Sequence, residues 1–317
     1  MNSPVNVLIN NIIHAFENTN SISLSMCTKA INSKLVNRQI DYDNGFNKVM
    51  APHGNKKNRE IYLQETYLSY LWSLIYSIFV IYEEGVQKPL INNRFNGKID
   101  FTSPLLCRAR RLYEWSISLT TNYSKWDEEL PNPRNYINDD EKFYTERTNA
   151  IFQNAVAFIL FHEYAHLTFG HDSYFDATPN NDWTDTQKSE RIQLENEADN
   201  FAFEMLISSD ELDITKLTKG ISVIMANISS LLIVNESSLL TQNTHPDLDD
   251  RLHRIFIKLN LEEETNQFYC WYLGCLAIRL FLMKHGEEDT SQQQDTAQDA
   301  FTHYLELLDE LKMRFTF

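Results

Sequence analysis

Glycine and proline are scarce in this chain of 317 residues, which contains only eight of each. All-β sandwiches and barrels need frequent turns, and glycine and proline are the residues that form most of them. Their scarcity argues against a turn-dense β-sandwich and favours helices. Hydrophobic residues make up 43% of the chain and charged residues 23%, which is a globular rather than a disordered composition.

Basic residues are in the minority. Lys and Arg total 28 against 44 Asp and Glu, which gives a formal net charge of −16. A protein that tracks the phosphates of a nucleic acid depends on a positive field, and this chain would repel a polyanion at long range. We therefore expect no nucleic-acid partner.

Cysteine is also sparse, and its spacing excludes two common kinds of site. The four cysteines show no pair separated by two residues, the spacing of zinc knuckles and redox motifs; they are Cys27, Cys107, Cys270 and Cys275. We expect reduced thiols in a core. The first residues, MNSPVNVLINNIIHAF, lack the basic start and cleavage site of a secretory signal, so the expected location is the cytoplasm.

One long apolar segment could be either a buried core helix or a helix in contact with a membrane. Residues 66–82, TYLSYLWSLIYSIFVIY, contain no charged residue and are about as long as the shortest membrane-spanning helices. Ser and Tyr interrupt the segment, and Glu65, Glu83 and Glu84 flank it. We interpret it as a buried core helix, with peripheral contact with the inner membrane as the alternative. The segment 268–283 is similar but contains Arg279, which favours burial against protein.

Turn residues divide the chain into three regions. We expect an N-terminal helical region at 1–140, a catalytic core at 141–285, and a polar linker with an amphipathic C-terminal helix at 286–317. Within the first region we expect helices at 1–35 and 105–121, short strands at 36–62, and a loop or hairpin at 85–104.

The motif HEYAH at 162–166 is the strongest functional signal. It lies in an apolar helical run that ends near Gly170, a plausible C-terminal cap. Residues four apart share one face of a helix, so His162 and His166 can present two imidazoles to a single cation. Polar groups in a buried helix destabilise it unless something satisfies them, and a metal ion does so.

Glu163 follows the first histidine and is the expected general base. From this position it leans toward the open coordination site and can take a proton from bound water. Zinc lowers the pKa of such water to about 7, within reach of a carboxylate base. The sequence therefore predicts a hydrolytic Zn²⁺ site.

A third protein ligand has to come from elsewhere. The metzincin pattern would need Gly at 169 and His at 172, but the chain has Phe169 and Asp172, which excludes that class. His171 is five residues past His166 and is expected to be a surface or capping histidine.

The segment SERIQLENEADNFAFEMLISSDEL at 189–212 offers the missing ligand. A capping box formed by Thr184 and Gln187 predicts a helix that begins near 185. Glu195 and Asp199 are four apart and share one face of it, so Glu195 is the expected ligand and Asp199 the acceptor for a ligand histidine's free ring N–H. Glu197 is the alternative ligand, although it lies roughly 200° around the helix.

A third element, NTHPDLDDRLHRI at 243–255, begins with a capping pattern at Thr244 and Asp247. His245 or Arg251 near the metal could stabilise the oxyanion of a tetrahedral intermediate. The alternative for this element is a capping turn with a salt bridge from Arg251. An apolar stripe identifies its core-facing side: Leu248, Leu252, Ile255 and Leu259.

These three segments together resemble gluzincin-type peptidases. The three-part order of HEYAH, ENEAD and THPDLDDRL is similar to that of the CaaX-prenyl-protease and heat-shock membrane peptidase group, in which the Glu of Glu-x-x-x-Asp is the third ligand. The segment ENEADNFAFEML also resembles the ImmA/IrrE-like regulatory proteases. The chain is most similar to the Lit-type phage-exclusion peptidases over roughly 150–260. The resemblance implies His162, His166 and Glu195 as zinc ligands and Glu163 as the base.

The same resemblance implies a biological role. It points to a cytoplasmic zinc endopeptidase that cleaves a host translation factor, elongation factor Tu, when a phage-derived peptide is present, and so causes abortive infection. The expected fold is mainly α, or α+β if the strands at 36–62 form a small sheet, with a zincin-like core built on the HExxH helix and the Glu-x-x-x-Asp helix.

Two alternatives stay open from the sequence. The first is an ImmA/IrrE-like protease that cleaves a repressor, which an attached DNA-binding domain would favour. The second is a non-catalytic binding module with zinc as a structural staple. A structural zinc site is usually closed by four protein ligands and does not need a base, so Glu163 favours the enzyme.

Overall fold

The computed structural model describes residues 3–171, 184–234, 247–287 and 296–314, and within these ranges the chain is mainly helical with one small sheet. The N-terminal half contains α1 (Ile9–Glu17), α2 (Ser23–Asn32), β1 (Asp41–Asp43), β2 (His53–Asn55), β3 (Glu60–Gln64), α3 (Glu65–Tyr82), α4 (Lys88–Ile91) and α5 (Pro104–Ser118). The remainder contains α6 (Asp139–Phe169), α8 (Asp185–Leu206), α9 (Asp213–Ile233), α10 (Leu248–Leu259), α11 (Glu264–Lys284) and α12 (Ala297–Met313). A 3-10 helix (Pro4–Leu8) precedes α1, and one π-helical turn (Glu83–Gln87) follows α3.

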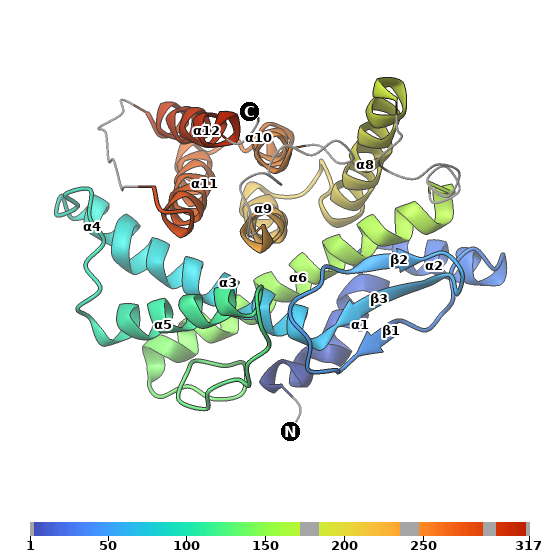
Figure 1. Ribbon diagram of the computed structural model, residues 1–317, viewed down its shortest axis with the longest axis horizontal. Helices are drawn as coiled ribbons and strands as arrows, with labels where there is room; N and C mark the ends of the chain where they lie inside the picture. The colour runs from blue at the N-terminus through green and yellow to red at the C-terminus, as the bar shows by residue number, and fades with distance from the viewer. Residues whose placement is uncertain (1–2, 172–183, 235–246, 288–295, 315–317) are drawn as a thin grey trace.

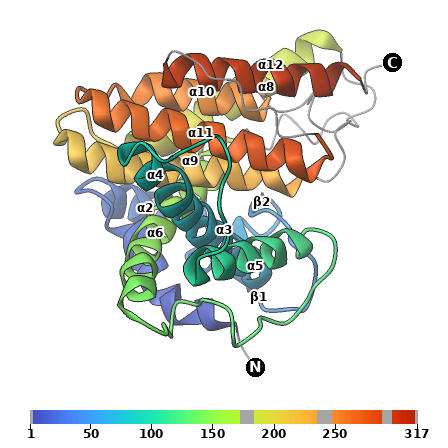
Figure 2. The same ribbon diagram turned by 90° about the vertical axis from the view of Figure 1, so that its left-hand side faces the viewer.

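The elements form two layers that the long helix α6 joins (Figures 1 and 2). One layer holds the sheet with α1, α2, α3 and α5, and the other holds α8 to α12. Helix α6 packs against α1 and α3 on one side and against α8 and α9 on the other. This central position is what brings its histidines between the two layers.

Helix α3 is the buried core helix that the sequence predicts for residues 66–82. All of its 18 residues are buried, and it contacts α5, α6, α9 and α11. Its first-turn carboxylate, Glu65, is held by the Ser3 backbone N–H at 2.7 Å and by the Asn6 side-chain amide at 2.9 Å. Protein rather than lipid therefore surrounds this segment on every side in the folded chain.

Among the described residues, one helix is long and apolar enough to cross a membrane, and it is α9 rather than α3. Its mean hydropathy over the most apolar window is 1.2, and 72% of that window is buried inside the protein. A single such helix is weak evidence for a membrane span, because the core helix of a soluble protein has the same properties.

The sheet has the strand order β1-β3-β2, with β1 parallel and β2 antiparallel to the central β3. These are the short strands expected at 36–62. Strand β2 is an edge strand, and Gly54 pairs with Ile61 in its register. A Cβ on Gly54 would lie 3.2 Å from the Leu167 side chain, so glycine allows this edge to approach α6 closely.

The loop or hairpin expected at 85–104 is wrong for its first part. Helix α3 continues into the π-helical turn and α4, which reach Ile91, and no strand forms in this fully described segment. Pro89, which has no N–H to donate, lies in the first turn of α4 directly after the π-helical turn, where the regular α-helical hydrogen-bond pattern is already interrupted. Helix α5 then begins at Pro104, as expected for 105–121, and Ser103 caps it.

The C-terminal helix is confirmed as α12, with Phe301, Leu308 and Leu311 buried. The division at 140 and 285 stays a prediction. One continuous hydrophobic cluster contains residues from all three proposed regions, for example Leu71, Phe161 and Leu308.

Candidate metal centre

Helix α6 presents His162 and His166 toward α8, at the interface of the two layers. The side chain of Asn138 caps the start of this 31-residue helix, and Gly170, with φ 76°, ends it in the left-handed region as expected. His162 and His166 are 9% and 6% exposed, and their Nε2 atoms lie 3.1 Å apart. The four-residue spacing thus brings both imidazoles to one point, as the motif predicts.

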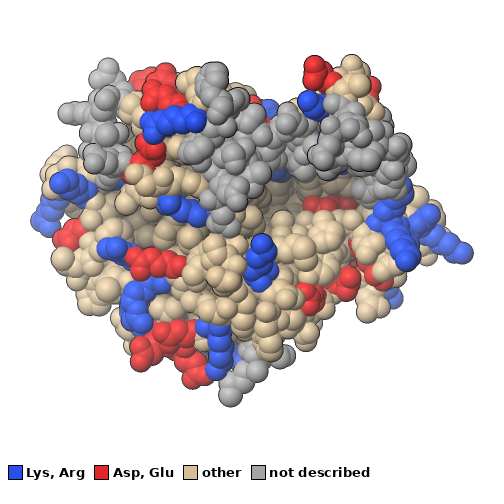
Figure 3. All heavy atoms as spheres, viewed as in Figure 1, with Lys and Arg blue, Asp and Glu red and all other residues tan. Residues whose placement is uncertain are grey.

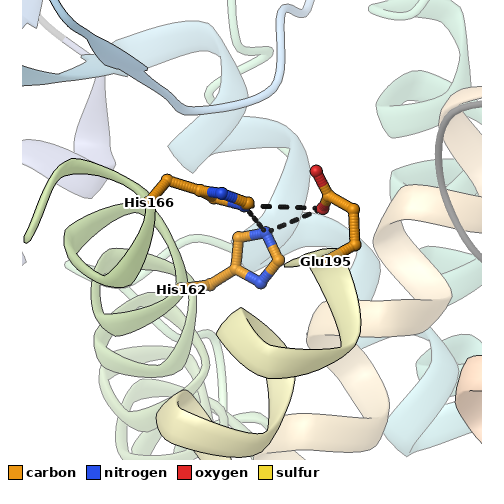
Figure 4. Close-up of side chains that lie close together, drawn as sticks. All are labelled: His162, His166 and Glu195. Carbon is orange, nitrogen blue, oxygen red and sulfur yellow. Dashed lines mark hydrogen bonds and ion pairs between the residues drawn. The ribbon is translucent and has the colours of Figure 1, made fainter. Parts of the chain in front are cut away.

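Glu195 on α8 completes a cluster of three (Figure 4). The capping box of Thr184 and Gln187 is present and begins α8 at Asp185, as predicted. Ala198 and Ala202 are fully buried where α8 packs on α6, and their small side chains let the two helices approach closely. The Glu195 Oε2 atom lies 3.4 Å from His162 Nε2 and 3.5 Å from His166 Nε2.

These separations fit a tetrahedral zinc ion. Zinc bonds to nitrogen and oxygen are about 2.0–2.1 Å long, so two ligand atoms at a tetrahedral angle lie about 3.3 Å apart. The three distances observed here, 3.1, 3.4 and 3.5 Å, bracket that value. Two ring nitrogens and a carboxylate oxygen also form a donor set that zinc prefers. The residues present therefore fit the metal that the sequence analysis expects.

Asp199 holds the first ligand histidine from behind. Its Oδ1 atom lies 2.9 Å from Nδ1 of His162, which leaves Nε2 directed at the cluster. Arg251 on α10 in turn donates from Nε to Oδ2 at 2.8 Å and from Nη2 to Oδ1 at 2.6 Å. The sequence left two roles open for Arg251, stabilisation of an oxyanion or a salt bridge. This bidentate contact favours the salt bridge.

The charges of this network shift the pKa values of its members. Burial raises the pKa of Asp199, but the Arg251 guanidinium and His162 outweigh burial and hold it well below its usual range. Burial lowers the pKa of His162, yet hydrogen bonds to Asp199 and Glu195 outweigh that effect and raise it to about 10. Metal binding to His162 therefore has to displace a proton, as is usual for imidazole ligands.

The second ligand histidine is held by His171, which was expected to be a surface or capping histidine. The surface position is wrong, and its backbone N–H does bond to the His166 carbonyl at the end of α6, at 3.1 Å. His171 is 4% exposed, and its Nδ1 atom lies 3.1 Å from Nδ1 of His166. Its Nε2 atom lies 3.4 Å from a carboxylate oxygen of Glu197. His171 is buried because the left-handed conformation of Gly170 turns the chain back onto the last turn of α6. That glycine was the signal in the sequence that could have identified His171.

Glu197 is therefore not placed as a metal ligand. Its side chain is 56% exposed and contacts His171 rather than the cluster, in agreement with its predicted position around the helix. Glu195 has a further neighbour of its own, because Nη2 of Arg191 lies 2.6 Å from its Oε1 atom. This contact leaves Oε2 directed at the two imidazoles, and no motif in the sequence pointed to Arg191.

Glu163 lies beside the cluster at the wall of a cleft of about 260 Å³. Its Oε2 atom accepts a hydrogen bond of 2.8 Å from the backbone N–H of Gly54 on edge strand β2. Burial raises the pKa of Glu163, which makes its carboxylate a stronger base than an exposed one. Both layers contribute to the walls of the cleft, whose lining includes Pro52, Tyr67, Phe158, His162, Glu195, Asn227 and Arg251.

The other residue named as catalytic from the sequence is His245, which lies outside the described residues, as does Thr244. Asp247 is at the N-cap position of α10 as expected, but its carboxylate contacts Lys312 at 3.2 Å. In the apolar stripe of that helix, Leu252, Ile255 and Leu259 are buried.

One comparison with known protein families covers the segments that form this cluster. The family model of Peptidase U49 matches residues 61–274, which include the histidines of α6 and the acids of α8. The "Cell death peptidase" of Escherichia coli (strain K12) is 26% identical over 215 residues, or 66% of this chain and 66%, just under two thirds, of that protein. No solved structure matches the chain. Because the family model covers well over half of it, this chain belongs to the Peptidase U49 family of proteases.

Proposed function

We propose that this protease is a zinc-dependent endopeptidase whose metal is bound by His162, His166 and Glu195. The observation that carries the proposal is the meeting of three ligand atoms from two helices within 4.8 Å of one another, next to a cleft. Within the described part of the chain, these are the only such group. Three protein ligands leave one tetrahedral position for water, which is typical of a catalytic zinc rather than a structural one.

A bound zinc ion would supply Lewis acidity, which polarises a scissile carbonyl and makes water easier to deprotonate. Glu163 would then take the proton from the attacking water and later donate it to the leaving amine. Its contact with Gly54 positions the carboxylate at the cleft rather than in bulk solvent. His162 and His166 would bind the metal as neutral imidazoles, and Asp199 and His171 would orient them.

The peptide substrate would lie along the edge of β2. The Gly54 N–H points at Glu163 and not at β3, so the main chain of β2 is directed toward the cleft at this residue. Exposed strand edges bind extended peptides by main-chain hydrogen bonds. A substrate strand added here would bring its carbonyl groups past Glu163.

The biological substrate that we propose is a host translation factor such as elongation factor Tu, cleaved in the cytoplasm when a phage-derived peptide is present. The support is the resemblance to phage-exclusion peptidases and the printed name of the Escherichia coli relative, a cell death peptidase. An acidic, cytoplasmic protease of this kind would block translation and prevent the phage from spreading.

Replacement of Glu163 by Gln tests the chemistry and the substrate together. We expect the variant to retain zinc, because none of the three ligands changes, and to lose at least about 100-fold in cleavage rate, as is usual for loss of a general base. Mass spectrometry of new peptide termini in cells, with and without phage infection, would compare wild type with the variant. Purified elongation factor Tu with a phage peptide mixture would test the named substrate directly.

Full activity of Glu163→Gln would exclude this mechanism. His162→Ala is the companion variant, and it should lose zinc by elemental analysis. Retention of stoichiometric zinc in that variant would exclude the assigned ligands. New termini in a repressor instead of a translation factor would favour the ImmA/IrrE-like alternative.

A further inference from the structure

One segment of this acidic chain is basic. Residues 18–59 contain seven Lys and Arg but only two Asp and Glu, whereas acids predominate in the chain as a whole. The two acids, Asp41 and Asp43, lie on β1, which β3 separates from β2. The next residue, Glu60, adds one carboxylate at the start of β3, where it accepts a hydrogen bond of 2.8 Å from the Asn37 side-chain amide. Cations still outnumber acids on the side where β2 lies.

The fold gathers these cations at one end of the sheet. The turn between β2 and β3 contains Lys56, Lys57 and Arg59, and it packs on the residues that follow α2. The Asn37 N–H donates to the Arg59 carbonyl at 2.6 Å, and the Arg59 guanidinium donates to the Lys34 carbonyl. We call the resulting group the basic end of the sheet, and it comprises Lys34, Arg38, Lys56, Lys57 and Arg59.

The basic end of the sheet is open to solvent. All five of its side chains are exposed, and Lys and Arg gather on this face at the right-hand end of Figure 3, over the β2–β3 turn. Lys34, Arg38 and Lys57 form no ion pair with any carboxylate in the described ranges. Their charge is therefore available to a partner.

The same strand connects this surface to the proposed catalytic base. Gly54 contacts Glu163, and Lys57 follows three residues later in the β2–β3 turn, so the two residues are at most about 11 Å apart. A peptide that lies along β2 at the cleft would pass the basic end of the sheet within a few residues of its scissile bond. The two features therefore act on one bound chain.

We propose that the basic end of the sheet is a substrate-recognition surface that binds an acidic segment of the protein substrate, about three to six residues from the cleaved bond. This inference rests on the proposed endopeptidase function. Binding in the cleft holds the acidic segment near the cations at a high effective concentration, so the attraction acts locally despite the overall charge of −16. A free polyanion such as RNA has no such attachment and would feel the repulsion of the whole chain.

The first test measures binding without cleavage, with zinc-loaded Glu163→Gln protein. Its probes are peptide pools with the same short randomised core and a tail of Glu, Gln or Lys residues on either end. Fluorescence anisotropy at about 0.05 M salt, where screening is weak, should show about tenfold tighter binding of the Glu-tailed pool than of the Gln-tailed pool. The preference should disappear at about 1 M salt.

A charge-matched pair of variants locates the effect. Lys34→Asn with Arg38→Gln and Lys57→Gln removes three charges from the basic end of the sheet, and Asn is chosen at 34 because φ there is 57°. The control removes three exposed charges elsewhere through Arg94→Gln, Lys98→Gln and Lys125→Gln. The first set should abolish the preference for Glu tails, and the control should keep it. Circular dichroism and thermal unfolding would confirm that both sets fold.

Cleavage gives the second test. With Glu163 intact, the first set of substitutions should raise KM for the Glu-tailed pool about tenfold and leave kcat unchanged, because the cations act on binding alone. Equal binding of all tails by the unsubstituted protein, or an equal loss in the control, would overturn the inference. The inference would also be overturned, in favour of a membrane-binding surface, if the unsubstituted protein showed no tail preference but sedimented with phosphatidylglycerol vesicles and the first set of substitutions abolished that sedimentation. If no pool is cleaved but the preference for Glu tails holds, the endopeptidase proposal fails. The assignment of the basic end of the sheet as a surface that binds acidic segments then still stands.

Discussion

Each ligand histidine on α6 depends on a different neighbour for its orientation. His162 has the buried carboxylate of Asp199, and His166 has the neutral ring of His171. Burial and the nearby His166 lower the pKa of His171, so its ring is neutral at physiological pH and can accept a hydrogen bond from its neighbour. The two supports come from different directions, because α8 supplies one and the turn after α6 supplies the other.

Replacement of His171 by Ala should weaken zinc binding about 10- to 100-fold, since outer contacts of this kind orient metal ligands. Competition against a chelator of known affinity would measure the change. His14→Ala is the matched control, because His14 is exposed and lies on α1. Unchanged zinc affinity in His171→Ala would show that His166 needs no partner at Nδ1.

The ion pair between Arg251 and Asp199 should matter far more for stability than an exposed pair. The Arg251 and Asp199 side chains are 12% and 18% exposed, whereas those of Arg110 and Glu114 are both 56% exposed. Arg251→Met should lower the free energy of unfolding by about 3 kcal/mol, because it leaves a buried carboxylate without its cation. Arg110→Met should lower it by less than about 0.5 kcal/mol. Urea denaturation of both variants would measure the difference, and similar small losses would contradict the buried role.

At the scale of elements, two helix ends contribute to the position of the site. The capping box at Thr184 determines where α8 begins, and Gly170 determines where α6 ends and His171 begins. Small residues then control how closely helices approach. Ala198 and Ala202 do so between α6 and α8, and Gly274 does so where α11 meets α10 and α12.

Gly274→Ala should destabilise the protein by about 1–3 kcal/mol, although alanine is the better helix former. An added Cβ would lie 2.7 Å from the Phe256 ring and 2.8 Å from the Phe301 ring, so the rings would have to move. Phe256→Leu makes room, and the double variant should therefore lose less than the sum of the two single variants. Strictly additive losses by thermal unfolding would show that these rings are not in conflict with the Cβ.

At the scale of the whole molecule, the proposed metal site lies between the two layers. The ligands come from α6 and α8, and the supporting Arg251 comes from α10, in the layer formed by α8 to α12. A ligand that binds only the folded chain stabilises all of it, by about 2.7 kcal/mol when its concentration is 100 times the Kd. A bound metal ion should therefore stabilise the packing of α6 against α8 in addition to its role in catalysis.

Zinc should raise the Tm of the metal-free protein by several degrees, and EDTA should reverse the rise. Differential scanning calorimetry of wild type and His162→Ala would measure it, with the variant as the control that lacks a ligand. A zinc-dependent rise of equal size in His162→Ala would show that the stabilising ion binds elsewhere.

Local patterns in the sequence determined the parts of this protein that depend on neighbouring residues. The four-residue spacings of His162 with His166 and of Glu195 with Asp199 place each pair on one helical face whatever surrounds the helix. Capping and hydrophobic patterns likewise predicted the start of α8, the end of α6 and the buried α3. The family resemblance came from these same local motifs.

Only the tertiary structure decided the contacts between residues far apart in the chain. Gly54 precedes Glu163 by 109 residues, and Arg251 follows Asp199 by 52. No periodicity encodes such pairs, because they depend on how whole helices and a sheet edge pack against each other. The turn that brings His171 back to His166 was also missed, although a single glycine conformation causes it. The basic end of the sheet has the same origin, because packing brings the β2–β3 turn against the chain after α2.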